Sequence, residues 1–216
     1  LEAERKVEAA NRVATETRLI HEGVAWDWID VSGDFTACLL REAGLADLIV
    51  VNCKRDGLLV VEPRGIVSSV ISRARSPVVA IPDNVRGFDV MGPALVAWDG
   101  SHGAARAAAD ALPLLARARS VHVVMFDVHD GAAATLEPSA TLGVVQWLAR
   151  HGVRAEGHVR YASADVGNAL LSNAADLGAD LLVMGCWGHG RLAERLLGGA
   201  TRTVMASMTA PMFTSH

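Results

Sequence analysis

The residues best suited to chemistry lie in a glycine-rich loop late in the chain. The loop reads Gly185-Cys186-Trp187-Gly188, then nine residues, then Gly198-Gly199-Ala200-Thr201. Glycines let the backbone approach a ligand closely and adopt positive φ angles. Free N–H groups at the start of the following helix, together with the helix dipole, favour an anion. The loop therefore predicts a phosphate-binding site, to which Thr201 would add a hydroxyl donor.

A carboxylate belongs to the same predicted site. Asp99 follows the apolar run Ala94–Trp98 and begins the turn Asp99-Gly100-Ser101. If this strand neighbours Asp180–Met184, Asp99 faces the crevice at the carboxyl ends of the strands, where open α/β sheets bind ligands. There it could accept hydrogen bonds from a ribose or hold the loop. The competing interpretation is a plain turn residue before Gly100, and the sequence leaves both open.

Other reactive side chains give weaker signals. His102 and His189 could approach a phosphate, although a solvent-facing loop position is the simpler interpretation of each. Neither stands with a nucleophile and a carboxylate in a triad pattern. A thiol near a helix start can be reactive. The favoured interpretation of Cys186 is nevertheless a small residue that only fills space in the loop. No metal-ligand spacing is visible among the remaining histidines, which are His21, His122, His129, His151, His158 and His216. We therefore predict no catalytic and no metal-binding residue.

Alternating strands and helices must position these residues in the second half of the chain. Short apolar runs that stop at turn residues predict strands: Ala94–Trp98, Val121–Phe126, Val153–Tyr161, Asp180–Met184 and Pro211–Thr214. Between them, composition and capping residues predict helices: Ala104–Ala118, Ala140–His151, Val166–Leu177 and Ala200–Ser207. This alternation predicts a parallel α/β sheet with right-handed crossovers.

A weaker copy of the pattern precedes it. The segment Ala46–Asn52 matches Ala179–Gly185 at an offset of 133, and Ser76–Val79 matches Ala210–Phe213 at 134. Gly65 and Ser68 likewise match Gly198 and Thr201. Three blocks in order at nearly one offset indicate an internal repeat.

The repeat predicts two domains, 1–87 and 93–216. In the first, a helix at Glu2–His21, a strand at Val24–Val31 and a helix at Phe35–Ala43 fit the third strand and its flanking helices. Trp26 and Trp28 would lie on one face of that strand. The first domain would lack its first strand, first helix and second strand, so roughly forty residues are expected before Leu1.

The quoted segments resemble the universal stress proteins of the tandem type, which have two such domains in one polypeptide. The resemblance is carried by Val96–Ser101, by Ala179–Gly185 and by the glycine loop ending at Thr201. It covers the second half closely and Glu2–Pro82 more loosely. It implies two repeats of a Rossmann-like, five-stranded parallel sheet flanked by helices, of the adenine nucleotide alpha hydrolase-like type, packed as a pseudo-dimer.

Some members of this family bind ATP through a Gly-x2-Gly-x9-Gly-Ser/Thr loop, and others lack the loop and bind none. The resemblance implies ATP, with Mg²⁺, as the ligand of the second domain, bordered by Ala97, Trp98, Asp99, Phe126, Met184, Gly185, Gly188, Gly198, Gly199, Ala200 and Thr201.

The chain departs from the family pattern in both domains. Gly199 stands where the binding form has Ser or Thr, and the lost hydrogen bond would weaken binding by roughly 1–3 kcal/mol. The bulky Trp187 would narrow the entrance. In the first domain Asn52 and Arg55 replace the first two glycines, so we expect that domain to bind no nucleotide and to act as a structural partner.

The function implied is that of a stress-response protein in which ATP acts as a signal or stabiliser, forming a homodimer and meeting an unidentified protein partner. One alternative is a slow nucleotide hydrolase, in which Asp99 holds Mg²⁺ and His102 or His189 assists. Another is an association module whose glycine loop is vestigial and whose apolar edge strands follow Pro77 and Pro211.

Composition limits the classes of protein to which the chain can belong. The 216 residues are 51% hydrophobic and 20% charged, which indicates a folded globular chain. A formal net charge of −4 lacks the basic footprint of a nucleic-acid-binding protein. No apolar run approaches the roughly 20 residues that span a bilayer. Three scattered cysteines without a CxxC pair fit a reducing compartment, so we expect a cytoplasmic location.

Overall fold

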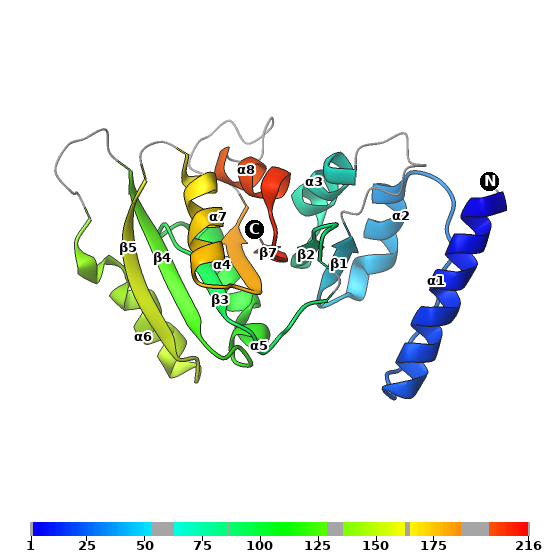
Figure 1. The fold of residues 1–216 in the computed structure, drawn as a ribbon, viewed down its shortest axis with the longest axis horizontal. Coiled ribbons are helices and arrows are strands. Elements are labelled where there is room, and N and C mark those ends of the chain that lie inside the picture. Colours follow the sequence, from blue (N-terminus) through cyan, green and yellow to red (C-terminus); the bar gives the residue numbers. More distant parts are fainter. Residues whose placement is uncertain are drawn as a thin grey trace.

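One mixed sheet organises the molecule (Figure 1). The computed structural model describes residues 2–52, 63–85, 87–128, 136–162, 165–186 and 199–215. Within them the strands are β1 (Ile49–Asn52), β2 (Val78–Ile81), β3 (Ala94–Ala97), β4 (Val121–Val128), β5 (Ala155–Ala162), β6 (Leu181–Gly185) and β7 (Met212–Ser215). Their order across the sheet is β1-β2-β7-β6-β3-β4-β5.

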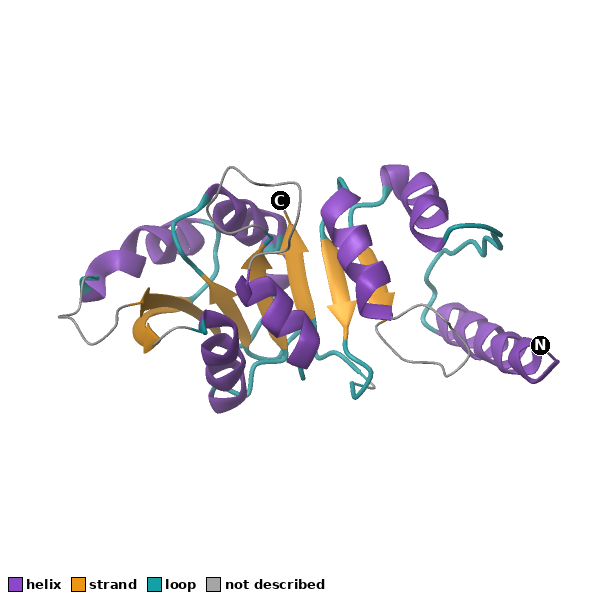
Figure 2. Ribbon diagram, turned by 90° about the horizontal axis from the view of Figure 1, so that it is seen from above, coloured by secondary structure: helices purple, strands orange, loops and turns teal. Residues whose placement is uncertain are grey.

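Helices cover both faces of this sheet (Figure 2). The α-helices are α1 (Glu2–His21), α2 (Phe35–Glu42), α3 (Pro63–Arg73), α4 (His102–Asp110), α5 (Leu112–Leu115), α6 (Leu142–Arg150), α7 (Val166–Asp176) and α8 (Gly199–Ser207). Two short 3-10 helices, η1 (Ala43–Leu45) and η2 (Pro138–Thr141), complete the description. The α/β fold expected from the alternating pattern is confirmed.

The second half forms a five-stranded parallel unit within the larger sheet. β3 lies in the middle and pairs in parallel with both β4 and β6, while β5 and β7 extend the unit on its two sides. The chain therefore leaves β3 toward β4 and later returns to the other side of β3 as β6. The connections that follow β3 and β6 leave in opposite directions at this reversal, which is where such sheets form a ligand crevice.

The first part contributes two strands, β1 and β2, which pair in parallel with each other. β2 also pairs with β7, in antiparallel orientation, and Val79 lies opposite Phe213. Expected as apolar edges after Pro77 and Pro211, these two strands pair with each other instead. Among the described strands the edges are β1 and β5, so association through β2 and β7 as free edges is ruled out.

Two apolar cores lie on opposite faces of the sheet. One contains buried side chains of α3, α7 and α8, such as Ile71, Leu170 and Val204. The other contains buried side chains of α4, α5 and α6, such as Ala108, Leu115 and Leu148. Both faces are therefore covered, as the near-continuous apolar strands of a parallel sheet require.

Local sequence signals set several helix boundaries. The side chains of Ser101 and Asp165 accept hydrogen bonds from the backbones of the first turns of α4 and α7, as N-caps do. The predicted helix Ala104–Ala118 is divided into α4 and α5 at Ala111, two residues before Pro113. Proline removes a backbone donor and clashes with the preceding turn, so the interruption follows from its chemistry.

The predicted strand Val24–Val31 is wrong. Within the described part of the chain this segment pairs with no strand. It lies against α1, where the Arg12 guanidinium lies 4.9 Å from the centre of the Trp28 ring and 3.3 Å from the Asp30 carboxylate. Trp28 Nε1 also donates to Asp30 at 2.8 Å. An alternating pattern becomes a strand only beside another strand, and here a cation and a carboxylate hold the segment to a helix instead. No described helix is both long and apolar enough to cross a membrane.

Candidate functional site

A cavity of about 510 Å³ opens at the carboxyl ends of β3, β4 and β6. Its volume lies within the roughly 300–1,000 Å³ typical of small-molecule sites. Eight residues singled out from the sequence line it: Ala97, Trp98, Asp99, Phe126, Met184, Gly185, Ala200 and Thr201. The fold thus brings together segments that lie more than a hundred positions apart in the sequence.

The other predicted glycines are placed differently. Gly199 begins α8, is exposed and does not line the cavity. Gly188 and Gly198 lie outside the described residues, as do Trp187 and His189. Within the described part of the chain, the glycine loop therefore contributes its first residue and its last two residues to the cavity wall.

Asp99 is held in a tight turn at the mouth of the cavity. Its Oδ1 accepts a hydrogen bond from the Ser101 backbone N at 2.9 Å, and Ser101 Oγ in turn accepts from the Ala104 backbone N at 3.1 Å. These two bonds connect the end of β3 directly to the start of α4. The turn role considered for Asp99 is confirmed, and the same carboxylate also lines the cavity.

Gly185 has a packing role that the loop motif does not reveal. A Cβ atom at this position would lie 2.5 Å from the Gly103 carbonyl carbon and 2.6 Å from the Ala104 backbone N. Only a residue without a side chain lets the end of β6 approach the first turn of α4 so closely. The identity of Gly185 is therefore explained by packing.

Thr201 lies in the first turn of α8 and is only 3% exposed. α8 is pressed against α7 at Gly167, where a Cβ atom would lie 2.9 Å from the Ala200 carbonyl oxygen. This close contact between helices fixes the first turn of α8, and with it Thr201, at the cavity wall.

One buried carboxylate at the cavity wall was not predicted from the sequence. Asp127 follows Phe126 on β4, is 5% exposed, and accepts a hydrogen bond from the Leu136 backbone N at 3.0 Å. It lines the cavity together with further residues not predicted, namely Ser101, Ala104, Val124, Met125, Val128, Leu136, Val166 and Leu170. A polar residue at the end of an apolar strand run was the available signal for Asp127, and the apolar residues gave none.

The cavity wall combines apolar surface with a few hydrogen-bonding groups. Apolar side chains come from β4 and α7, and the polar ones are the carboxylates of Asp99 and Asp127 and the hydroxyls of Ser101 and Thr201. No Lys or Arg occurs among the described lining residues. A phosphate here would consequently rely on hydroxyls and on backbone N–H groups at the start of α8.

Cys186 and His102 do not supply a nucleophile to this cavity. The Cys186 side chain is fully buried and lies 2.6 Å from Thr214 Oγ1. Burial raises the pKa of its thiol to about 11, against a smaller opposing effect of the Thr214 hydrogen bond. The thiol is therefore protonated near neutral pH and unreactive. His102 begins α4, is exposed and does not line the cavity.

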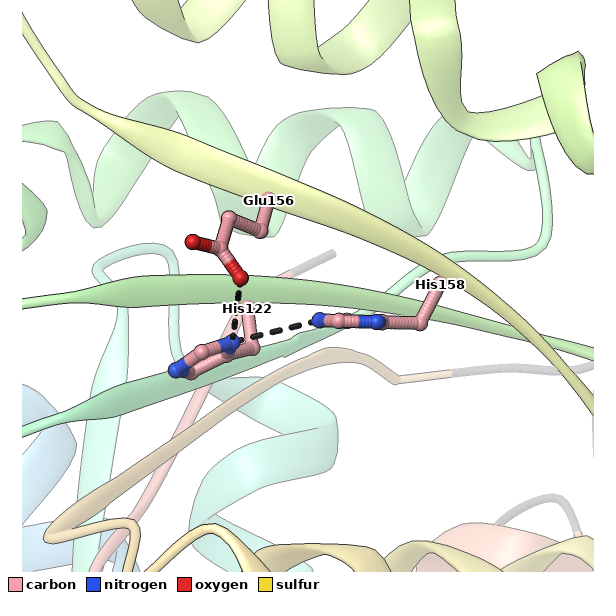
Figure 3. Close-up of side chains that lie close together, drawn as sticks. All are labelled: His122, Glu156 and His158. Atoms are coloured by element: carbon pink, nitrogen blue, oxygen red, sulfur yellow. Dashed lines mark hydrogen bonds and ion pairs between the residues drawn. The ribbon is translucent and has the colours of Figure 1, made fainter.

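A second group of polar side chains lies on β4 and β5. His122 Nδ1 is 3.2 Å from His158 Nε2 and 3.9 Å from Glu156 Oε2 (Figure 3). No metal-ligand spacing in the sequence marks these histidines, because they meet only through the parallel pairing of β4 and β5.

The sequence model of the Universal stress protein family matches residues 91–215. Among solved structures, a universal stress protein from Archaeoglobus fulgidus is similar at 17% identity and a TM-score of 0.69, covering 97% of this chain and 77% of that one. A putative universal stress protein from Pseudomonas aeruginosa is similar at 20% identity and a TM-score of 0.61, covering 96% and 77%. No curated protein sequence matches the chain.

Proposed function

Because the chain belongs to the universal stress protein family, we propose that it is a stress-response protein that binds ATP, with Mg²⁺, as a sensor or regulator. The observation that carries the proposal is the cavity at the carboxyl ends of β3, β4 and β6. It occupies the position where the strand order reverses, which is the usual ligand position in sheets of this kind.

The lining residues fit the parts of an adenine nucleotide. Val124, Phe126 and Leu170 supply an apolar wall suited to a base, and the Asp99 carboxylate is an acceptor suited to ribose hydroxyls. Thr201 and the start of α8 supply donors for phosphate. Mg²⁺ would accompany the phosphates and neutralise part of their charge.

A sensing role is favoured over turnover. The described lining residues include no histidine, lysine or cysteine that could act as a general base or nucleophile. The two lining carboxylates already accept backbone hydrogen bonds. We accordingly propose that any ATP hydrolysis is far slower than the roughly 1–100 s⁻¹ of kinases.

We further propose the two-domain organisation, 1–87 and 93–216, with nucleotide bound only in the second. Matching registers support it, since Ile49 pairs with Val78 in the first unit as Leu182 pairs with Met212 in the second. A homodimer and a cytoplasmic location belong to the same proposal. Apolar side chains exposed between α1 and α2, such as Ile29 at 60%, support self-association; sedimentation equilibrium of the purified chain tests it.

The test is to denature freshly purified protein and identify the released small molecules by mass spectrometry. We expect ATP or ADP, near one per chain. ATP–Mg²⁺ at 100 times its dissociation constant should add about 2.7 kcal/mol to the free energy of unfolding. Neither nucleotide nor stabilisation would contradict the proposal and favour the association module.

A matched pair of variants locates the site. Asp99→Asn should weaken ATP binding about tenfold or more, because one charge-assisted hydrogen bond contributes roughly 1.5–3 kcal/mol. Asp89→Asn is the control, since Asp89 Oδ1 makes the same kind of turn bond, to the Met91 backbone N at 2.9 Å, away from the cavity. Equal affinities in the two variants, measured by calorimetry, would place the nucleotide elsewhere.

A further inference from the structure

The side chains of His122, Glu156 and His158 point toward one another on one face of the sheet (Figure 3). His122 on β4 pairs directly with Glu156 on β5, and His158 lies two residues further along β5. Side chains alternate between faces along a strand, so this register places all three on the same face. One ligand atom from each lies within 4.8 Å of the other two.

We propose that these three side chains bind a divalent transition-metal ion of the zinc type. Two imidazoles and a carboxylate are ligands of this ion class, and a three-ligand set leaves a position for water or another ligand. Nitrogen ligands at zinc distances in a tetrahedral arrangement lie about 3.3 Å apart. The observed 3.2 Å between His122 Nδ1 and His158 Nε2 already matches this spacing.

The electrostatic surroundings are compatible with such a site. Burial lowers the pKa of His158, with further lowering by Arg160 and His122 and a smaller opposing effect of Glu156. The Glu156 side chain is 76% exposed and the His122 side chain 16%. His158 is likewise partly buried. Both imidazoles are therefore less free to move than the carboxylate, which can close onto an ion from solvent.

The backbone beneath the cluster is also fixed. Gly157 lies between Glu156 and His158 on the opposite face, where a Cβ atom would overlap the Thr141 side chain of η2. This packing holds β5 against η2, and the parallel ladder holds β5 beside β4. None of the three side chains lines the cavity, but Val124, which pairs with His158, does. The metal site therefore borders the cavity, and its geometry stands without the proposed ATP binding.

The experiment uses the untagged full chain and zinc chloride alone. Equilibrium dialysis with metal analysis should find one zinc site per chain that His122→Gln and His158→Gln weaken. Each loss should be at least as large as the roughly 10–100-fold typical of removing a residue that supports a metal ligand. Glu156→Gln alters an exposed side chain and should weaken binding without disturbing the fold.

The matched control is His151→Gln, which removes an exposed imidazole at the end of α6 and should leave the zinc site intact. Arg160→Gln removes a neighbouring cation and should tighten binding. Cobalt(II) should give the intense visible absorption of a low-symmetry site in the wild type and lose it in His158→Gln. Equal zinc affinity in wild type and the His122→Gln/His158→Gln double variant, with unchanged circular dichroism, would overturn the proposal, as would an absence of zinc binding.

Discussion

Two strand–helix–strand units of this molecule are built alike, yet only one borders the cavity. β1, α3 and β2 repeat the arrangement of β6, α8 and β7, with the strands parallel in each unit. β6 has β3 on its other side, whereas β1 is an edge among the described strands. The cavity is walled by β3 and β4 as well as β6. The repeated unit thus becomes part of the site only where β3 and β4 stand beside it.

One pair of matching positions shows the same contrast. Thr201 in α8 is buried at the cavity wall, while its counterpart Ser68 in α3 directs its hydroxyl to the sulfur of Met205, 3.7 Å away. A hydroxyl at one position of the repeat can therefore serve a ligand or a contact between helices. What surrounds the helix decides which of these it does.

The largest effect should come from removing a buried side chain at the β2–β7 pairing that joins the two units (the β2–β7 seam). Phe213 on β7 is 1% exposed and lies opposite Val79, so Phe213→Ala should cost about 3–5 kcal/mol of unfolding free energy. Phe35→Ala is the control, because Phe35 is 52% exposed and should cost about 1 kcal/mol or less. Urea denaturation measures the free energy of unfolding of both variants. Similar midpoints would contradict the prediction that Phe213 at the β2–β7 seam stabilises the fold.

The free energy of unfolding should depend on pH through a buried thiol of the second unit. The pKa of Cys186 is raised from 9.0 to about 11 in the folded state, so folding favours the protonated thiol. Its contribution is complete below pH 9 and is lost as the pH rises from about 9 to about 11. The loss should reach about 3 kcal/mol. Cys186→Ala should lack this slope, and parallel stability curves for variant and wild type over that range would contradict the prediction.

A smaller effect on stability is expected when either of two helical glycines is replaced by alanine, and its sign should differ between them. Gly167→Ala would crowd Ala200 and Thr203 at the α7–α8 contact and should cost about 1–3 kcal/mol. It should also weaken ATP binding, since α8 carries Thr201. Gly143→Ala in α6 meets nothing within 4 Å and should gain roughly 0.5–1 kcal/mol. Thermal unfolding distinguishes them, and destabilisation of both would point to a general intolerance of alanine.

The strands of the second half were predictable because each is a short apolar run ended by turn residues. β3 and β6 begin and end within one residue of their predicted bounds, and their pairing brings Asp99 and Met184 to one cavity as expected. Apolar lining residues such as Leu170 were not predictable, because their pattern is that of any core helix. Whether the eight predicted lining residues hold ATP stays a prediction.

The remaining features could not be predicted because they depend on pairing between strands that are far apart in the sequence. The β2–β7 seam joins strands whose sequences carry no mark of antiparallel partnership. Similarly, His122 and His158 meet only because a helix returns the chain to a parallel neighbour, and no local spacing records that. Trp26 and Trp28 alternate as they would in a strand, but none of the described strands lies beside them to form a ladder.

The β2–β7 seam also has a consequence for synthesis. β2 is made long before β7, and the elements from β3 to α8 are translated between them. Until β7 leaves the ribosome, the β7-facing edge of β2, with Val78, Val79 and Ala80, has no partner from this seam. An unpaired apolar edge invites pairing with other chains. The nascent polypeptide therefore stays open to aggregation at this edge until β7 is complete.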